Sequence, residues 1–83
     1  MSEDLKTKIR ELEDMIETVL ISIPREISAR EFYLGAVSRF RSGPAKELFT
    51  DLANQEKGHE AELRKILERL RSELDDLKKG SST

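Results

Sequence analysis

The sequence predicts an all-α fold, an antiparallel helical hairpin that dimerises into a four-helix bundle. Helix-forming residues dominate the composition, and only four glycines and two prolines occur among the 83 residues. Apolar residues recur every three or four positions along two long arms, as on helix faces that pack against other helices. One clear break, at Arg41–Pro44, separates the arms, and so short a loop returns the chain antiparallel to itself.

The first arm is predicted to be a long helix that is kinked or broken near its middle. Pro24 has no backbone N–H and frees the carbonyl of Leu20, so we expect the kink or break within residues 21–24, where Ser22 would cap the restarted helix. Residues 1–22 would then form an N-terminal helical extension that packs on the second arm or on another dimer. The inward-facing positions of this arm are Leu5, Ile9, Leu12, Ile16, Val19, Ile23, Glu26, Arg30, Tyr33, Val37 and Phe40.

The second arm is predicted to begin at Gly43 and Pro44, because proline suits the first turn of a helix. Together with the end of the first arm it forms the hairpin domain, residues 23–78. Residues 79–83 are expected to be a disordered tail. The inward-facing positions of this arm are Ala45, Leu48, Leu52, Glu56, His59, Leu63, Ile66, Leu70, Leu74 and Leu77.

Composition excludes several classes of function. The 15 basic and 17 acidic residues are mixed along the chain, so we expect neither a nucleic-acid partner nor a membrane anchor. The opening residues contain no apolar signal-peptide region, which favours a cytoplasmic location, with enclosure in a protein compartment left open. Since the chain has no cysteine, disulfides, thiolate metal sites and cysteine nucleophiles are excluded.

Three ionisable residues interrupt the apolar faces: Glu26 on the first arm, and Glu56 and His59 on the second. A buried, unpaired carboxylate is costly and must find water, a proton or a cation. Glu26 lies 15 residues before Arg41 and His59 lies 15 residues after Pro44. Both are therefore about 22 Å from the turn at 1.5 Å per residue, and they would face each other at one level.

Glu56 and His59 share one face of their helix because they are three residues apart. A Glu-x-x-His pair opposed by a glutamate from a neighbouring helix is the ligand set of carboxylate-bridged di-iron bundles. Oxygen and imidazole donors suit iron or manganese, and zinc could also bind. One hairpin has too few ligands for two metal ions, whereas two hairpins related by a two-fold axis supply four carboxylates and two imidazoles. The sequence thus predicts a homodimer, or a higher homo-oligomer, with two metal ions per dimer.

The segment EISAREFY at residues 26–33, followed by QEKGHE at residues 55–60, resembles the rubrerythrin-like branch of the ferritin superfamily. The resemblance covers about residues 15 to 70. It implies that Glu26 is a terminal carboxylate ligand, Glu56 a bridging carboxylate and His59 a terminal nitrogen ligand. It also implies that Tyr33, seven residues after Glu26, hydrogen-bonds near the metal ligands without binding the metal.

Two departures from that family pattern bear on function. Typical members carry four helices and two ligand motifs in one chain, whereas this chain carries one motif, which implies assembly from two or more chains. It also lacks the cysteine-rich iron module that delivers electrons in full rubrerythrins, which puts the usual peroxide reduction in doubt.

Three hypotheses of function follow. The first is an iron-binding protein whose inter-subunit di-iron centre oxidises Fe(II), a ferroxidase with no catalytic residues beyond the metal ligands. The second is a peroxide-reducing di-iron oxidoreductase that needs an external electron donor. The third is a non-enzymatic helical dimerisation module. Arg30 is expected to be an ion-pair partner or a core residue with its head in solvent, and Glu60 and Glu62 are expected to lie on the solvated face.

Overall fold

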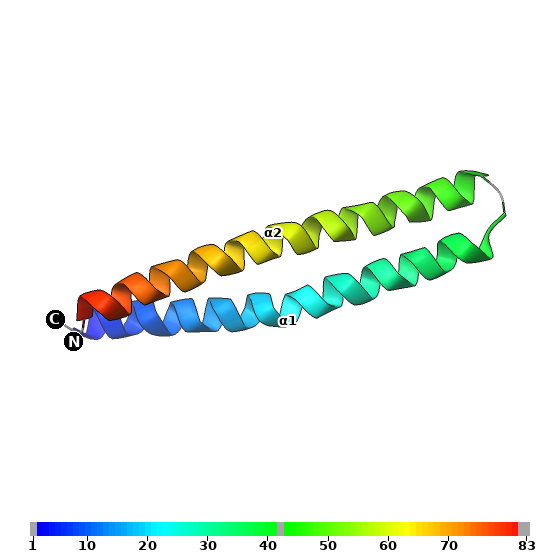
Figure 1. Cartoon of the computed structure of the whole chain (residues 1–83). Helices are drawn as coiled ribbons and strands as arrows, with labels where there is room; N and C mark the ends of the chain where they lie inside the picture. The colour runs from blue at the N-terminus through cyan, green and yellow to red at the C-terminus, as the bar shows by residue number, and fades with distance from the viewer. Residues whose placement is uncertain (1, 42, 82–83) are drawn as a thin grey trace.

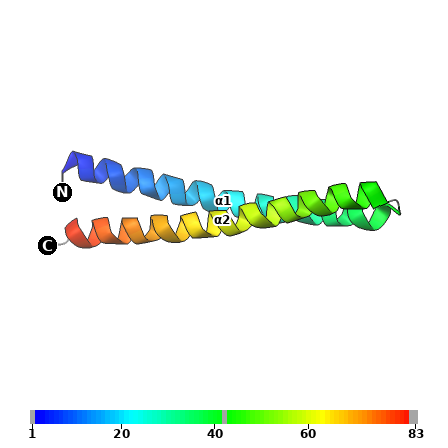
Figure 2. The same cartoon turned by 90° about the horizontal axis from the view of Figure 1, so that it is seen from above.

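Two long helices form an antiparallel hairpin in a computed structural model that describes residues 2–41 and 43–81 (Figure 1). Helix α1 spans Glu3–Arg39 and α2 spans Gly43–Ser81, so the predicted hairpin is confirmed. The two ends of the chain lie together, opposite the turn, and the helices cross near mid-length (Figure 2). Neither helix, within the described residues, is long and apolar enough to span a bilayer.

Helix α1 begins at a well-formed cap. The Ser2 hydroxyl oxygen accepts a hydrogen bond from the Leu5 backbone N–H at 3.1 Å, and Glu3 and Asp4 occupy the first turn. Both features stabilise a helix N-terminus, by satisfying an unpaired donor and by placing negative charge at the positive end of the helix dipole. The helix ends where Phe40 becomes extended, with φ −105° and ψ 134°.

Helix α1 is continuous through Pro24, so a break at residues 21–24 is wrong, whereas the alternative, a kink there, stays a prediction. Ser22 does not cap a second helix. Its hydroxyl donates instead to the carbonyl of Thr18 at 2.8 Å, inside the helix. The carbonyl that Pro24 leaves free belongs to Leu20, an exposed residue, where water can satisfy it. One helix runs through residue 22, so no break in the chain marks a boundary there. The division into an N-terminal extension and a hairpin domain stays a prediction.

Helix α2 continues through residues 79–81, which the sequence analysis assigned to a disordered tail. Lys79 forms an ion pair with Asp75, one turn earlier, at 2.9 Å, and Lys78 and Lys79 place positive charge at the negative end of the helix dipole. The remainder of the predicted tail, residues 82–83, lies outside the described residues.

The best-packed region lies between the middle of the hairpin and its termini. There Val19 and Ile23 of α1 pack against Leu67 and Leu70 of α2, which confirms that the N-terminal half of α1 packs on the second arm. Partly buried apolar side chains surround this core cluster: Leu12, Ile16, Ile27 and Leu63. Nearer the turn, the ring of Phe49 stacks between Tyr33 and Phe40, with centroid distances of 6.3 and 5.4 Å.

The predicted inward face of α2 is partly wrong. Leu48, His59 and Ile66 are exposed, while Ala53 and Leu67 are buried in their place. The apolar surface of α2 is therefore wider than one helix can cover, and α1 covers only one side of it. On α1, Phe40 is also more exposed than predicted, although its ring stacks on Phe49.

Candidate metal centre

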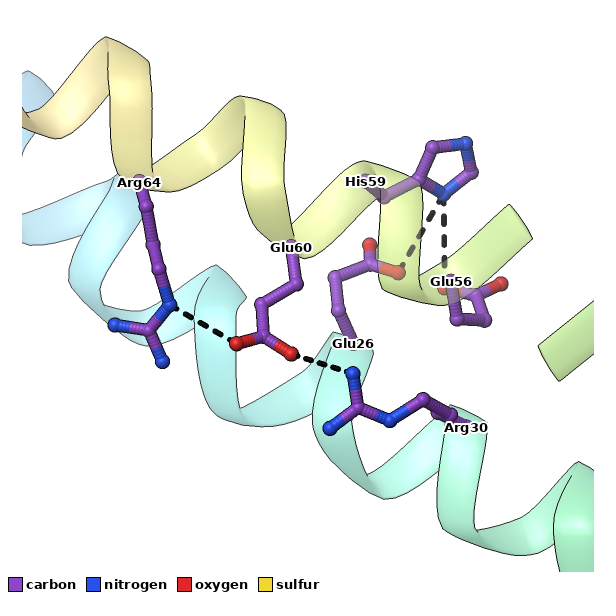
Figure 3. Close-up of polar contacts among 6 residues, drawn as sticks. All are labelled: Glu26, Arg30, Glu56, His59, Glu60 and Arg64. Atoms are coloured by element: carbon purple, nitrogen blue, oxygen red, sulfur yellow. Dashed lines mark hydrogen bonds and ion pairs between the residues drawn. The ribbon is translucent and has the colours of Figure 1, made fainter. Parts of the chain in front are cut away.

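Glu26 of α1 meets Glu56 and His59 of α2 at one level of the hairpin (Figure 3). The Nδ1 atom of His59 lies 3.6 Å from a carboxylate oxygen of Glu26 and 3.6 Å from one of Glu56. One potential ligand atom from each of the three residues lies within 4.8 Å of the other two. These are the three residues whose common level the sequence predicts. In the described part of the chain they form the one such group of three potential ligands.

The candidate centre is buried on one side and open on the other. The Glu26 and Glu56 side chains are 26% and 18% exposed, whereas His59 is 56% exposed. The two carboxylates thus lie close together and are mostly buried between the helices. The imidazole of His59 lies at the solvent-exposed edge of the group. A cation bound among the three residues would offset the repulsion between the two carboxylates.

The three donors fit a divalent transition metal. Donor atoms that are about 2.1 Å from one metal ion lie about 3.0 Å apart at octahedral angles and about 3.4 Å apart at tetrahedral angles, a little less than the 3.6 Å that separates His59 Nδ1 from each carboxylate. Carboxylate oxygens and an imidazole nitrogen suit iron, manganese and zinc. Three protein donors leave positions open on an octahedral ion, and the open side of the centre gives access to them.

A second polar cluster lies beside the candidate metal centre and joins Glu60 of α2 to two arginines (Figure 3). The Glu60 carboxylate accepts hydrogen bonds from Arg30 of α1 at 2.8 Å and from Arg64 of α2 at 2.9 Å. The bond from Arg64, supported by Arg30 and by both positive charges, holds the pKa of Glu60 below its usual range, against the opposing effect of partial desolvation.

This cluster corrects one prediction and confirms another. Glu60 is not on the solvated face, because its side chain is only 15% exposed, whereas Glu62 is exposed as expected. Arg30 is an ion-pair partner, as predicted. The four-residue spacing of Glu60 and Arg64 signals their contact within α2, but nothing in the sequence pointed to the bond with Arg30 on the other helix.

Tyr33, which the family resemblance placed near the metal ligands, packs among aromatic rings. It stacks on Phe49 and makes an edge contact with Phe32 at 5.8 Å. Among the described residues, no hydrogen bond joins Tyr33 to Glu26, Glu56 or His59. Its role beside the ligands stays a prediction.

A helical hairpin with carboxylates and an imidazole between its helices is the arrangement expected of a ferritin-like protein. The rubrerythrin family model matches residues 4–83, nearly the whole chain. The chain belongs to the rubrerythrin family, whose members generally bind iron. The search of curated proteins found no match, and no solved structure matches the hairpin.

Proposed function

We propose that this protein is a ferroxidase, in which two hairpins related by a two-fold axis join their ligand sets into one di-iron centre. The observation that carries the proposal is the convergence of Glu26, Glu56 and His59 in a group that is open on one side. A three-ligand set with one open face matches half of a carboxylate-bridged centre, and a second copy of the chain supplies the other half.

Charge balance supports two ligand sets for two ions. The paired sets contain four carboxylates and two neutral imidazoles, and their four negative charges offset two divalent cations. A site with no net charge avoids the large cost of burying uncompensated charge between helices. In one hairpin alone, the centre stays exposed through His59.

Uncovered apolar surface continues from the centre along the same face. Leu48 is eleven residues before His59 and Ile66 is seven after it, so the three lie on one side of α2, and both apolar residues are exposed. Beside Ile66, a groove of about 330 Å³ opens between the helices. Its lining is mainly apolar and consists of Asp14, Met15, Thr18, Val19, Ile66 and Leu70. A second hairpin that covered this face would bury the groove and close the centre together.

In the proposed reaction, Fe(II) is the substrate. Two bound ions give up one electron each, and dioxygen takes up both electrons with two protons to become hydrogen peroxide. Glu26, Glu56 and His59 of each subunit would hold the ions, with Glu26 and His59 as terminal ligands and Glu56 as the bridging carboxylate that the family resemblance implies. The helices exclude water from the buried side of the centre and keep the ions close enough to deliver both electrons to one oxidant.

The proposal is tested by adding Fe(II) in air to the metal-free protein and following ferric absorbance. Wild type should oxidise Fe(II) faster than buffer, and Glu56→Ala and His59→Ala should each lose most of that rate, because each removes a ligand. Glu68→Ala is the matched control, since it removes an exposed carboxylate of the same helix outside the ligand set. A wild-type rate equal to that of buffer would refute the proposal.

The family match favours one alternative, reduction of hydrogen peroxide to water. That reaction consumes two electrons and two protons per peroxide, so it needs an external electron donor. Peroxide-dependent oxidation of NADH through added redox proteins, at a rate that exceeds Fe(II) oxidation by oxygen, would support it. Protein that binds no metal and gains no thermal stability from iron would instead be a helical dimerisation module.

A further inference from the structure

We infer that the ion pair between Arg30 and Glu60 sets the axial register of α1 against α2 and so holds Glu26 level with Glu56 and His59. In this role Arg30 and Glu60 are positioning residues that bind no metal themselves. The inference rests on the proposed metal centre for its functional consequence, although the register itself can be measured without metal.

The pair lies within one helical turn of all three ligands. Arg30 follows Glu26 by four residues on α1, and Glu60 follows Glu56 by four on α2. Their 2.8 Å contact joins the two helices. The contact between His59 and Glu26, inside the candidate centre itself, also joins the two helices.

The pair is also well placed to act as a rigid link. The Arg30 and Glu60 side chains are 27% and 15% exposed, so their attraction is less screened than that of a surface pair. Arg64, on the same helix as Glu60, binds the second carboxylate oxygen. This second contact lies within α2 and does not join the two helices.

Apolar side chains are less buried at the level of the candidate centre than on either side of it. The core cluster of Val19, Ile23, Leu67 and Leu70 lies on the side of the termini, and the aromatic stack lies on the side of the turn. Between these regions the apolar contacts come from Ile27 and Leu63, which are only partly buried and lie within one turn of Arg30 and Glu60. In helical pairs with regular apolar spacing, a single buried polar contact can select one register over its alternatives.

If Arg30 acted on the metal only through its positive charge, removing Arg30 would strengthen metal binding rather than weaken it. Two arginines beside an acidic cation site repel the cation, so removing either one would strengthen metal binding. If Arg30 instead sets the register, its removal displaces Glu26 from Glu56 and His59 and weakens binding. The direction of the change therefore separates the two roles.

The first experiment titrates the metal-free protein with Co²⁺ and follows its visible d–d absorbance, which reports coordination geometry. Arg30→Met should bind Co²⁺ about 10-fold to 100-fold more weakly, the usual effect of losing a residue that orients metal ligands. Arg64→Met is the matched control. It removes an equally close partner of Glu60 within one helix and should match wild type or bind more tightly. Arg30→Lys should recover most of the loss. Unchanged or tighter binding in Arg30→Met overturns the inference.

The second experiment measures register in the absence of metal. The chain has no cysteine, so spin labels can be attached at Ser28→Cys on α1 and Ala61→Cys on α2, both exposed. The distance between labels should be narrowly distributed in wild type and in Arg64→Met, and shifted or broadened in Arg30→Met. An unchanged distribution in Arg30→Met also overturns the inference. Wild-type protein that bound no Co²⁺ would refute the proposed function, while the label distances would still decide whether Arg30 sets the register.

Discussion

His59 and Glu60 are neighbours in the chain but point to different places. The imidazole of His59 reaches Glu26 and Glu56, while the carboxylate of Glu60 turns to Arg30 and Arg64 (Figure 3). Consecutive helical residues are rotated by about 100°, so one turn of α2 can supply both a metal ligand and an inter-helix ion pair. Because two arginines already bind Glu60, it does not add a further free carboxylate to the metal centre.

The depressed pKa of Glu60 predicts a specific dependence of stability on pH. A carboxyl group whose pKa is lower in the folded state stabilises the fold above its unfolded pKa, and this stabilisation is lost as pH falls through the folded value. The free energy of unfolding of wild type should therefore drop more than that of Glu60→Gln as the pH falls from 7 to below about 4.5. Urea unfolding of the metal-free proteins at several pH values measures this difference. Glu68→Gln should behave as wild type, and a Glu60→Gln curve parallel to wild type would contradict the prediction.

At the scale of the helices, Gly58 is an unusual residue in the middle of α2. It is exposed, and a Cβ atom built there meets nothing within 4 Å. Glycine lowers helix stability relative to alanine because its backbone loses more conformational freedom on folding.

Gly58→Ala should therefore raise the free energy of unfolding by about 0.5 to 1 kcal/mol. Gly35→Ala on α1 should give a similar gain, because Gly35 is equally exposed and uncrowded. Urea unfolding of the metal-free proteins measures both changes. Destabilisation by Gly58→Ala alone would mean that another surface packs closely against this turn of α2.

The arrangement of the two helices is largely predictable from residue spacing. The side of each helix that faces its partner is not. The Arg41–Pro44 break and the regular apolar spacing predict the hairpin, and residue counting predicts that Glu26 and His59 share one level. Spacing cannot show which side of a wide apolar face meets α1, so the prediction that Leu48 and Ile66 face inward is wrong. The predicted break at Pro24 does not occur, and the carbonyl that Pro24 frees belongs to Leu20 on an exposed part of the helix. The bond from Arg30 to Glu60 joins distant parts of the chain and leaves no local pattern.

At the scale of the whole molecule, the hairpin is one helix pair thick. Its Cα atoms extend over 63 × 14 × 13 Å. A molecule of this shape cannot enclose a large core, and no large side chain among the described residues is fully buried. Small domains without disulfides usually gain stability from a metal, a partner or both, and the proposed dimer supplies both.

The proposed dimer predicts that Ile66→Glu weakens self-association. The substitution places a carboxylate in the apolar groove beside the metal centre, where burial in a dimer would cost several kcal/mol. Because Ile66 is exposed in one hairpin, the fold of the chain should survive, as circular dichroism would show. Ala61→Glu adds the same charge at another exposed position of α2 and should leave the dimer intact. Sedimentation over a range of concentrations measures both variants, and equal masses for the two would argue against a dimer across this groove.

The most direct test of the shared centre is to load the protein with Fe(II) without oxygen and measure iron per chain and mass on one sized fraction. The proposal predicts about one iron per chain, in a dimer or a multiple of it, and loss of iron from His59→Ala. Iron bound by a species of single-chain mass, or a dimer that carries no iron, would contradict a metal centre built by two subunits.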